Sequence, residues 1–170
     1  MSALREGSIS SSMFLANEAA AAAEAAPQAP DRAVDRAAEA VWVASQSRSW
    51  SSLVVVPMER TAAAVALARA VAIAGSFQRG EPVEGLDLRG LPLAESRPHA
   101  ERLADRSRPY RRVAVVDSPL ESQTAVLLAR AADAAVLVAE RDRTRLADVR
   151  AVLERLGQER FVGAVMLEPK

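Results

Sequence analysis

The stretch from residue 110 to residue 140 constrains the fold of this chain more than any other part. It reads YRRVAVVDSPLESQTAVLLARAADAAVLVAE and contains two apolar runs, residues 113–116 and 134–139. Continuous valine-rich runs of this kind are typical of strands that are covered on both faces, as in a parallel sheet. The segment between them is amphipathic and too long for a hairpin, which predicts a crossover helix. The stretch therefore predicts two parallel strands of an α/β fold.

Asp117 is the most suggestive single residue, because it directly follows the first of these apolar runs. An acidic residue at the end of a parallel strand lies at the carboxyl edge of the sheet, where open α/β folds bind their ligands. The alternative role is local: such a carboxylate accepts a hydrogen bond from the backbone of the next segment or of a nearby loop. We expect the local role.

Composition excludes several kinds of site. The chain has 22 basic and 22 acidic residues, so no net field favours nucleic acid or an anionic membrane. It has no cysteine, which excludes disulfides, thiolate catalysis and cysteine-ligated zinc. Its one histidine, His99, excludes a multi-histidine metal site and is expected to be an exposed surface residue among charges. We therefore expect no metal and no other cofactor.

The chain shows no targeting or membrane signal. Its beginning has an apolar patch too short for the core of a signal peptide. The longest nearly apolar run, residues 62–75, is interrupted by Arg69 and is too short to span a bilayer. We expect a cytoplasmic protein without direct membrane insertion.

The domain organisation predicted from the sequence is a tail and one domain. Residues 1–30 are rich in alanine and serine, carry few large apolar side chains and end at Pro27 and Pro30. They are expected to form a flexible extension, with an arm that docks on a partner as the alternative. Residues 31–170 are expected to form a single α/β domain.

The first half of that domain begins with a helix from an N-cap at Asp31 to about Ser45. Residues 51–56 (SSLVVV) predict a strand that Pro57 ends, since proline cannot continue a central ladder. Residues 61–74 predict a helix that is apolar almost all round and therefore buried on more than one side, with Gly75 as its C′ residue.

The second half is less regular at first. Residues 76–109 contain several prolines and glycines, and predict a short edge strand within 85–93 and a short charged helix within 94–106. Thr144 is the expected N-cap of a helix that closes at Gly157, and residues 161–167 (FVGAVML) predict a final strand. Strands and helices alternate, which predicts a three-layer α/β fold with a mostly parallel sheet of about four to six strands and helices on both faces.

Several short motifs follow one another in an order typical of one family. The first are a basic residue and threonine opening a helix, leucine-alanine within it and a glycine that closes it. A tyrosine before an apolar strand, an acid-led proline turn after that strand and alanine-aspartate before the next strand follow, and Val-Gly-Ala-Val in the final strand is the last. The matching residues are Arg60-Thr61, Leu67-Ala68, Gly75, Tyr110, Asp117-Ser118-Pro119-Leu120, Ala132-Asp133 and the segment 162–165.

This order resembles the deviant Walker P-loop ATPases over roughly residues 35–168. It is most similar to the cytoplasmic tyrosine-kinase-like domains of bacterial exopolysaccharide export systems. The resemblance implies a P-loop-like fold, with Arg60 and Thr61 where the family has Lys-Thr at the phosphates. It also implies that Asp117 stands where the family's acid helps to hold magnesium through water.

The departures from the family bear on activity. A P-loop binds phosphate through consecutive backbone N–H groups that glycine makes accessible, and residues 57–60 (PMER) contain no glycine. Pro57 lacks an N–H group, and Glu59 would bring a carboxylate beside the phosphates. Arg60 is a poor replacement for a compact lysine ammonium. Tyr110 is the only tyrosine, so the phosphorylated tyrosine tail of the kinases has no counterpart.

We therefore expect a truncated, degenerate relative, a pseudo-kinase or pseudo-ATPase with no catalytic residues and no metal site. Arg60, Thr61 and Asp117 would be its vestigial nucleotide site. It would act in exopolysaccharide biosynthesis or export by binding a membrane co-polymerase or export protein at the inner face of the cell membrane, and by forming a homo-oligomer, without binding nucleic acid.

Two alternatives remain open at this point. One is an active ATPase or phosphotransferase with an atypical site built from Arg60, Thr61 and Asp117. The other is a localisation factor, like the partition and pilus-assembly relatives, that lacks catalysis.

Overall fold

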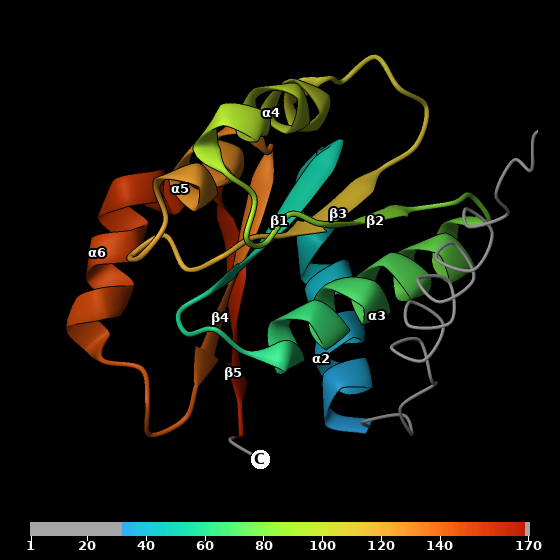
Figure 1. Ribbon diagram of the computed structural model, residues 1–170. Coiled ribbons are helices and arrows are strands. Elements are labelled where there is room, and N and C mark those ends of the chain that lie inside the picture. The colour runs from blue at the N-terminus through green and yellow to red at the C-terminus, as the bar shows by residue number, and fades with distance from the viewer. Residues whose placement is uncertain (1–31, 169–170) are drawn as a thin grey trace, which may run out of the picture. The chain divides into compact units, whose positions relative to one another are not determined.

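Five parallel strands form one sheet in the order β2-β3-β1-β4-β5 (Figure 1). The structure is a computed structural model that describes residues 32–168. The strands are β1 (Ser52–Pro57), β2 (Glu84–Asp87), β3 (Arg112–Val115), β4 (Ala134–Glu140) and β5 (Phe161–Leu167). The α/β fold with a parallel sheet is therefore confirmed, and the strand count lies within the expected range.

Helices cover both faces of the sheet, as Figure 1 shows. One face packs against two helices and the other face against three. The helices are α2 (Arg32–Ser45) and α3 (Ala62–Arg79) on the first face, and α4 (Ser96–Ala104), α5 (Gln123–Ala131) and α6 (Leu146–Leu156) on the second. Two short 3-10 turns, η1 (Leu93–Glu95) and η2 (Gln158–Arg160), precede α4 and β5.

The three central strands explain the valine-rich runs. Every residue of β1, β3 and β4 is buried. Within β1, Leu53 and Val55 pack on the side of α2 and α3, whereas Val54 and Val56 pack on the side of α4, α5 and α6. Successive side chains of a strand point to opposite faces, so a strand covered on both sides is apolar at nearly every position. The buried polar residues Ser52, Arg112 and Glu140 lie at strand ends.

The crossover predicted between the two valine-rich runs is present as α5. Ser122 caps this helix, since its hydroxyl accepts a hydrogen bond from the N–H group of Ala125 at 3.2 Å. The edge strand and short helix expected in the proline-rich region are also present, as β2 and α4.

Gly75 does not end its helix, in contrast to the sequence prediction. Helix α3 continues to Arg79, and Gly80 forms its C-cap with a φ of 69°. Gly75 lies inside the helix because a Cβ there would lie closer than 3.0 Å to three carbons of the Trp42 ring. Glycine is thus required by the close approach of α2 and not by a left-handed backbone.

Two further predictions about single residues were wrong. Thr144 is not the N-cap of α6, which begins at Leu146 after Arg145. His99 is not an exposed side chain: it is half-buried in α4, and its Nδ1 atom is buried without a hydrogen-bond partner among the described residues. His99 is partly covered by the protein around α4, and the charged residues next to it in the sequence do not reveal this burial.

The predicted N-cap Asp31 and the predicted tail lie outside the described residues. Within residues 32–168, no helix combines the length and the apolar character that crossing a membrane requires.

Candidate functional site

The loop between β1 and α3 is where the sequence places the vestigial nucleotide site, and it is fastened at both sides. The N–H group of Met58 donates to the carbonyl of Val138 at 2.8 Å, which continues the β1–β4 pairing by one residue. The hydroxyl of Ser118 donates to the carbonyl of Met58 at 2.9 Å. Met58 is itself buried, with 4% of its surface exposed. Both backbone groups of Met58 are therefore bound within the protein.

Thr61 and Arg60 follow in the same loop. Thr61 is the N-cap of α3, and its hydroxyl accepts a hydrogen bond from the N–H group of Ala63 at 3.2 Å. Arg60 is exposed, and its guanidinium forms no ion pair with any residue between 32 and 168. The threonine hydroxyl thus serves the helix start, as threonine does at many N-caps.

Glu59 connects this loop to the segment after β4. The hydroxyl of Thr144 donates to Oε1 of Glu59 at 2.6 Å and accepts from the N–H group of Glu140 at 3.0 Å. The other carboxylate oxygen, Oε2, is buried and has no hydrogen-bond partner within the described part of the chain. From the sequence, Glu59 is only a residue unfavourable for phosphate, and this bridge is not apparent because Thr144 has the residue type and place of an N-cap.

Asp117 binds the loop after β2. Its Oδ2 atom accepts a hydrogen bond from the N–H group of Gly90 at 2.6 Å. Gly90 has a φ of 68°, a left-handed conformation that glycine adopts without strain. The sequence predicts a local hydrogen bond to a backbone N–H group but does not identify Gly90 as its donor.

Asp87 and Arg89 form an ion pair beside Asp117. Arg89 donates to Asp87 through Nε at 2.8 Å and through Nη2 at 2.7 Å. Chiefly because of this hydrogen bond, the pKa of Asp87 is lowered from its ordinary value and the pKa of Arg89 is raised. Leu88 between them is buried and extends the pairing of β2, since its N–H group donates to the carbonyl of Val115 at 2.9 Å.

The three residues of the predicted site share one edge of the sheet. Strands β1 and β3 are parallel neighbours, so Arg60, Thr61 and Asp117 all follow carboxyl ends of adjacent strands. The hydrogen bond from Ser118 to Met58 joins the two loops, whereas the carboxylate of Asp117 is bound to Gly90. Within residues 32–168, no three acidic or histidine side chains are grouped so that they could hold a metal ion.

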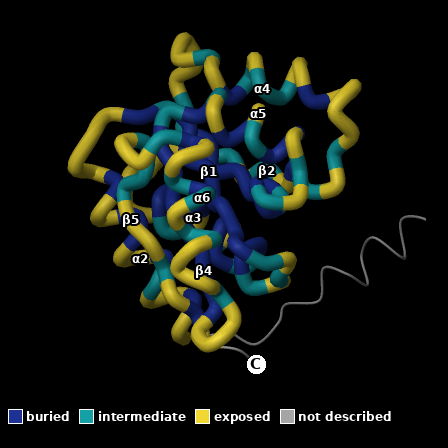
Figure 2. The backbone as a smooth tube through the Cα atoms, turned by 90° about the vertical axis from the view of Figure 1, so that its left-hand side faces the viewer, coloured by how far each residue is buried: buried dark blue, intermediate teal, exposed yellow. Residues whose placement is uncertain are grey.

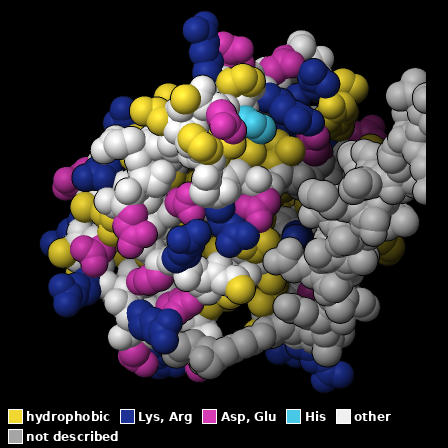
Figure 3. All heavy atoms as spheres, in the orientation of Figure 1, with side chains coloured by type: hydrophobic (Ala, Val, Ile, Leu, Met, Phe, Trp, Pro, Cys, Tyr) yellow, Lys and Arg dark blue, Asp and Glu magenta, His cyan; other side chains and the backbone are white. Residues whose placement is uncertain are grey.

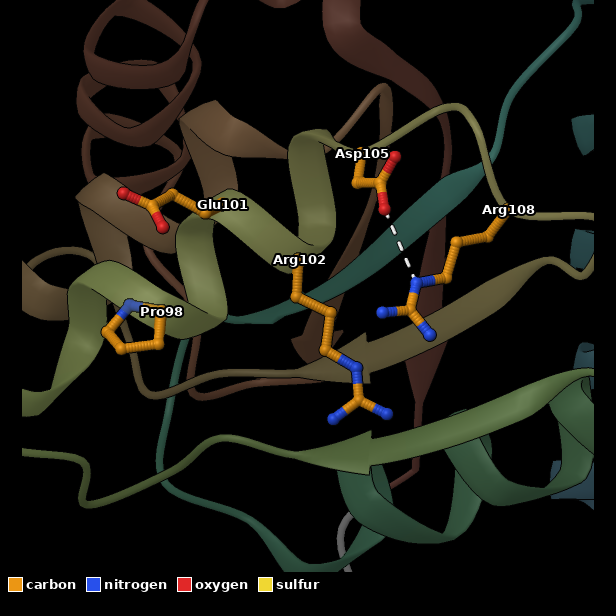
Figure 4. A pocket seen from close by; sticks show the side chains of 5 residues that line it. All are labelled: Pro98, Glu101, Arg102, Asp105 and Arg108. Atoms are coloured by element: carbon orange, nitrogen blue, oxygen red, sulfur yellow. Dashed lines mark hydrogen bonds and ion pairs between the residues drawn. The ribbon is translucent and has the colours of Figure 1, made fainter.

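A hollow of 530 Å³ lies elsewhere, beside α4 and the loop that follows it (Figure 4). Its lining residues are Pro98, Glu101, Arg102, Asp105 and Arg108. Arg102 pairs with Glu84 at the start of β2, and Arg108 pairs with Asp105 at 3.3 Å. The hollow is thus at the amino ends of the strands, far along the sheet from the predicted nucleotide site, and both signs of charge line it.

Charge on the surface is equally mixed. Figure 3 shows basic and acidic side chains interspersed over one face of the molecule. This distribution agrees with the equal numbers of basic and acidic residues in the sequence.

Comparison with known proteins gives structural matches only. No protein-family model matches the chain, and no curated protein sequence matches it. Among solved structures, the chain is similar to the kinase domain of the Escherichia coli tyrosine kinase ETK, with a TM-score of 0.56 and 12% identity over 69% of this chain and 67% of that one.

Two further solved structures are similar. The kinase domain of VpsO matches with a TM-score of 0.60 and 15% identity, over 80% of this chain and 96% of that chain. The chimeric protein CapA2B2 matches with a TM-score of 0.57 and 12% identity, over 86% of this chain and 89% of that chain. The fold is thus similar to that of the ETK and VpsO kinase domains, in agreement with the resemblance of the motifs.

Proposed function

We propose that this protein is a non-catalytic binding module of exopolysaccharide biosynthesis or export. In this proposal it keeps the fold of the tyrosine-kinase domains but does not bind or turn over nucleotide. It binds a membrane co-polymerase or export protein from the cytoplasmic side and associates with copies of itself.

The loop from Pro57 to Thr61 is the observation that carries this proposal. A phosphate cradle needs several free N–H groups that point into one space. Here Pro57 has no N–H group, the N–H group of Met58 is engaged with Val138, and no glycine is present. A triphosphate would also meet the carboxylate of Glu59, which is held in place by Thr144.

The state of Asp117 supports the same proposal. An acid that orders magnesium through water needs an accessible carboxylate beside the phosphates. The Oδ2 atom of Asp117 instead accepts from Gly90 at 2.6 Å. Loops at both adjacent strands are therefore held by contacts within the protein.

Nucleotide binding is tested directly by thermal unfolding with millimolar ATP and magnesium. A ligand that binds the folded state must stabilise it by mass action. Because the proposal is that nucleotide does not bind, the expected result is no change in Tm. The matched variants are Arg60→Ala and Asp117→Ala. A rise in Tm that either variant abolishes contradicts the proposal and favours the active alternative, for which Asp117→Ala should also abolish nucleotide turnover.

The partner is tested by affinity purification of the full chain from its own organism, followed by mass spectrometry. Recovery of a membrane polysaccharide co-polymerase or export protein supports the proposal. Recovery of a secretion ATPase or a polar scaffold protein instead contradicts it and favours the localisation factor.

A further inference from the structure

The guanidinium group of Arg112, at the start of β3, is buried but only partly hydrogen-bonded. Its side chain is fully covered by the protein. Nη1 donates to the carbonyl of Asp105 at 2.9 Å, whereas Nε and Nη2 have no hydrogen-bond partner within residues 32–168. Burying a charged group costs free energy unless the charge is paired and its donors are satisfied. The surroundings of this arginine therefore indicate which charge it faces.

The acid that faces Arg112 is shared with a second arginine. Oε2 of Glu84 lies 3.7 Å from Nε of Arg112, which is too far for a hydrogen bond. The same carboxylate accepts a hydrogen bond from Arg102 through its other oxygen, Oε1. Arg102 lines the hollow beside α4. Two guanidinium groups at this hollow thus have one carboxylate between them.

The two acids that line the hollow are already paired with other arginines. Asp105 pairs with Arg108 at 3.3 Å. Glu101 pairs with Arg97, one helical turn earlier on α4, at 2.9 Å. Neither acid is therefore left to compensate the charge of Arg112.

The group as a whole has one basic residue more than it has acids. Its arginines are Arg97, Arg102, Arg108 and Arg112, and its acids are Glu84, Glu101 and Asp105. An excess of positive charge beside a concave surface favours a negatively charged ligand.

Two of these arginines have donors to spare. Arg102 and Arg108 extend into the hollow from α4 and from the loop that follows it (Figure 4). Arg102 donates to Glu84 through Nη2, and its Nη1 has no acceptor in the described part of the chain. Arg108 donates to Asp105 through Nε and to the hydroxyl of Tyr110 through Nη1 at 3.0 Å. Its Nη2 has no acceptor among the described residues either.

The hollow lies at the surface. Figure 2 shows α4 on the outside of the molecule, and every residue from 104 to 110 is exposed or half-buried. The volume of 530 Å³ falls within the range of about 300–1,000 Å³ that is usual for small-molecule sites. A ligand larger than a bare ion therefore has both access and space.

We propose that this hollow binds an oxyanion, a phosphate or carboxylate group carried by a small polar molecule. Arg102 and Arg108 donate to the oxygen atoms of the anion, and the buried charge of Arg112 strengthens the attraction. Arginine suits this role because its planar group presents several N–H donors to phosphate or carboxylate oxygens. The site is separate from the proposed function and does not depend on it.

Isothermal titration calorimetry of the full chain tests binding, with inorganic phosphate and glucuronate as probes in a buffer without other oxyanions. The expected result is binding of at least one of them at millimolar concentration and no binding of glucose, a neutral sugar. Binding of phosphate alone assigns the site to phosphate groups, and binding of glucuronate alone assigns it to carboxylates. If neither anion binds, or if glucose binds as tightly as glucuronate, the proposal is overturned.

Arg108→Gln tests whether the anion lies in the hollow. This side chain is 50% exposed, so the variant should fold, and the affinity should fall at least about tenfold because a charge-assisted hydrogen bond is lost. The matched control is Arg106→Gln, which removes the same charge from the same loop. Arg106 pairs with Asp133 and does not line the hollow, so the affinity should stay nearly unchanged. An equal loss in both variants would indicate general attraction by charge and would overturn the site.

Glu84→Gln tests the role of the excess charge. Glutamine keeps an acceptor for Arg102 but removes the one negative charge that Arg102 and Arg112 share. Anion binding should become several-fold tighter, whereas damage to the hollow would weaken it. Unchanged or weaker binding overturns the proposal.

The hollow and the predicted nucleotide site can be tested independently, because the hollow is at the amino ends of the strands and Arg60 follows a carboxyl end. A rise in Tm with ATP that Arg108→Gln abolishes and Arg60→Ala leaves intact would come from phosphate groups in the hollow and would support the anion site. Failure of the anion site leaves the proposed function unaffected.

Discussion

Gly75 of α3 lies directly against the indole ring of Trp42 in α2. Trp42 is 1% exposed, and its ring also meets the ring of Trp50 edge to face, with centroids 5.7 Å apart. The tryptophan is therefore fixed from two sides, and the space for it exists only because residue 75 has no side chain.

Gly75→Ala should consequently destabilise the protein. Overpacking of this kind costs about 1–3 kcal/mol, and the better helix propensity of alanine offsets up to about 1 kcal/mol of it. Denaturant unfolding should show a lower midpoint. In the double variant Gly75→Ala with Trp42→Phe, the alanine should cost less than it does alone, because the smaller ring leaves room. An equal cost in both backgrounds would show that Trp42 is not the cause.

Thr144→Val should destabilise the link between the β1–α3 loop and the end of β4. The variant keeps the shape of the side chain but removes the hydroxyl, which leaves Oε1 of Glu59 without its donor and the N–H group of Glu140 without its acceptor. A group left unsatisfied in this way costs about 1–3 kcal/mol. Thr144→Ser keeps the hydroxyl and should retain most of the stability in the same unfolding measurement.

Asp117→Ala should affect stability and not nucleotide handling. The lost hydrogen bond to Gly90 is exposed, so we expect a cost of about 1 kcal/mol, below the usual range for a charged acceptor. Asp117→Asn keeps an acceptor and should cost less. Equal stability of all three proteins would contradict the local role, and a change in ATP hydrolysis above background would indicate catalysis.

The pKa of Asp87 should rise toward its ordinary value in Arg89→Gln. The hydrogen bond from Arg89 is the largest cause that lowers this pKa, and the variant removes it. Because the folded-state pKa is lowered, the pair stabilises the protein above the unfolded pKa of about 3.9, and this contribution is lost as the pH falls through the folded value. Asp87 is 41% exposed in this pair, so the effect on stability should stay below about 1 kcal/mol.

An NMR titration of the Asp87 carboxyl carbon in both proteins measures this shift. Arg97→Gln is the control, because Arg97 pairs with Glu101 on α4 and not with Asp87. A titration of Asp87 that Arg89→Gln leaves unchanged would remove Arg89 as the cause.

The sequence was sufficient for the parts of the fold that depend on burial. Strands β1, β3 and β4 are buried on both faces. Burial on both faces requires consecutive apolar residues, such as Val54 and Val55, and these are visible in the sequence. Helix α5 was also predictable from the sequence, because a connection between parallel strands needs about a dozen residues or more and is usually a helix.

Contacts between residues far apart in the sequence could not be predicted from local patterns. Gly75 has a role that depends on Trp42, a residue of another helix, and no local pattern distinguishes it from a helix-ending glycine such as Gly80. Thr144 has an N-cap's residue type and place, but its hydroxyl is bound to Glu59, far away in the chain. The sequence predicts that Asp117 accepts a hydrogen bond from a nearby backbone N–H group. The donor is Gly90, which follows β2 and is brought near Asp117 by the pairing of β2 with β3.

The position of β1 has a consequence for synthesis. It is the first strand of the described chain but lies in the middle of the sheet, between β3 and β4. A ribosome must therefore deliver the chain as far as Glu140 before both neighbours of this mostly apolar strand are in place. Until then, residues 52–57 remain a target for chaperones and for misassembly, so the speed of translation through the intervening helices should influence how much protein reaches the native state.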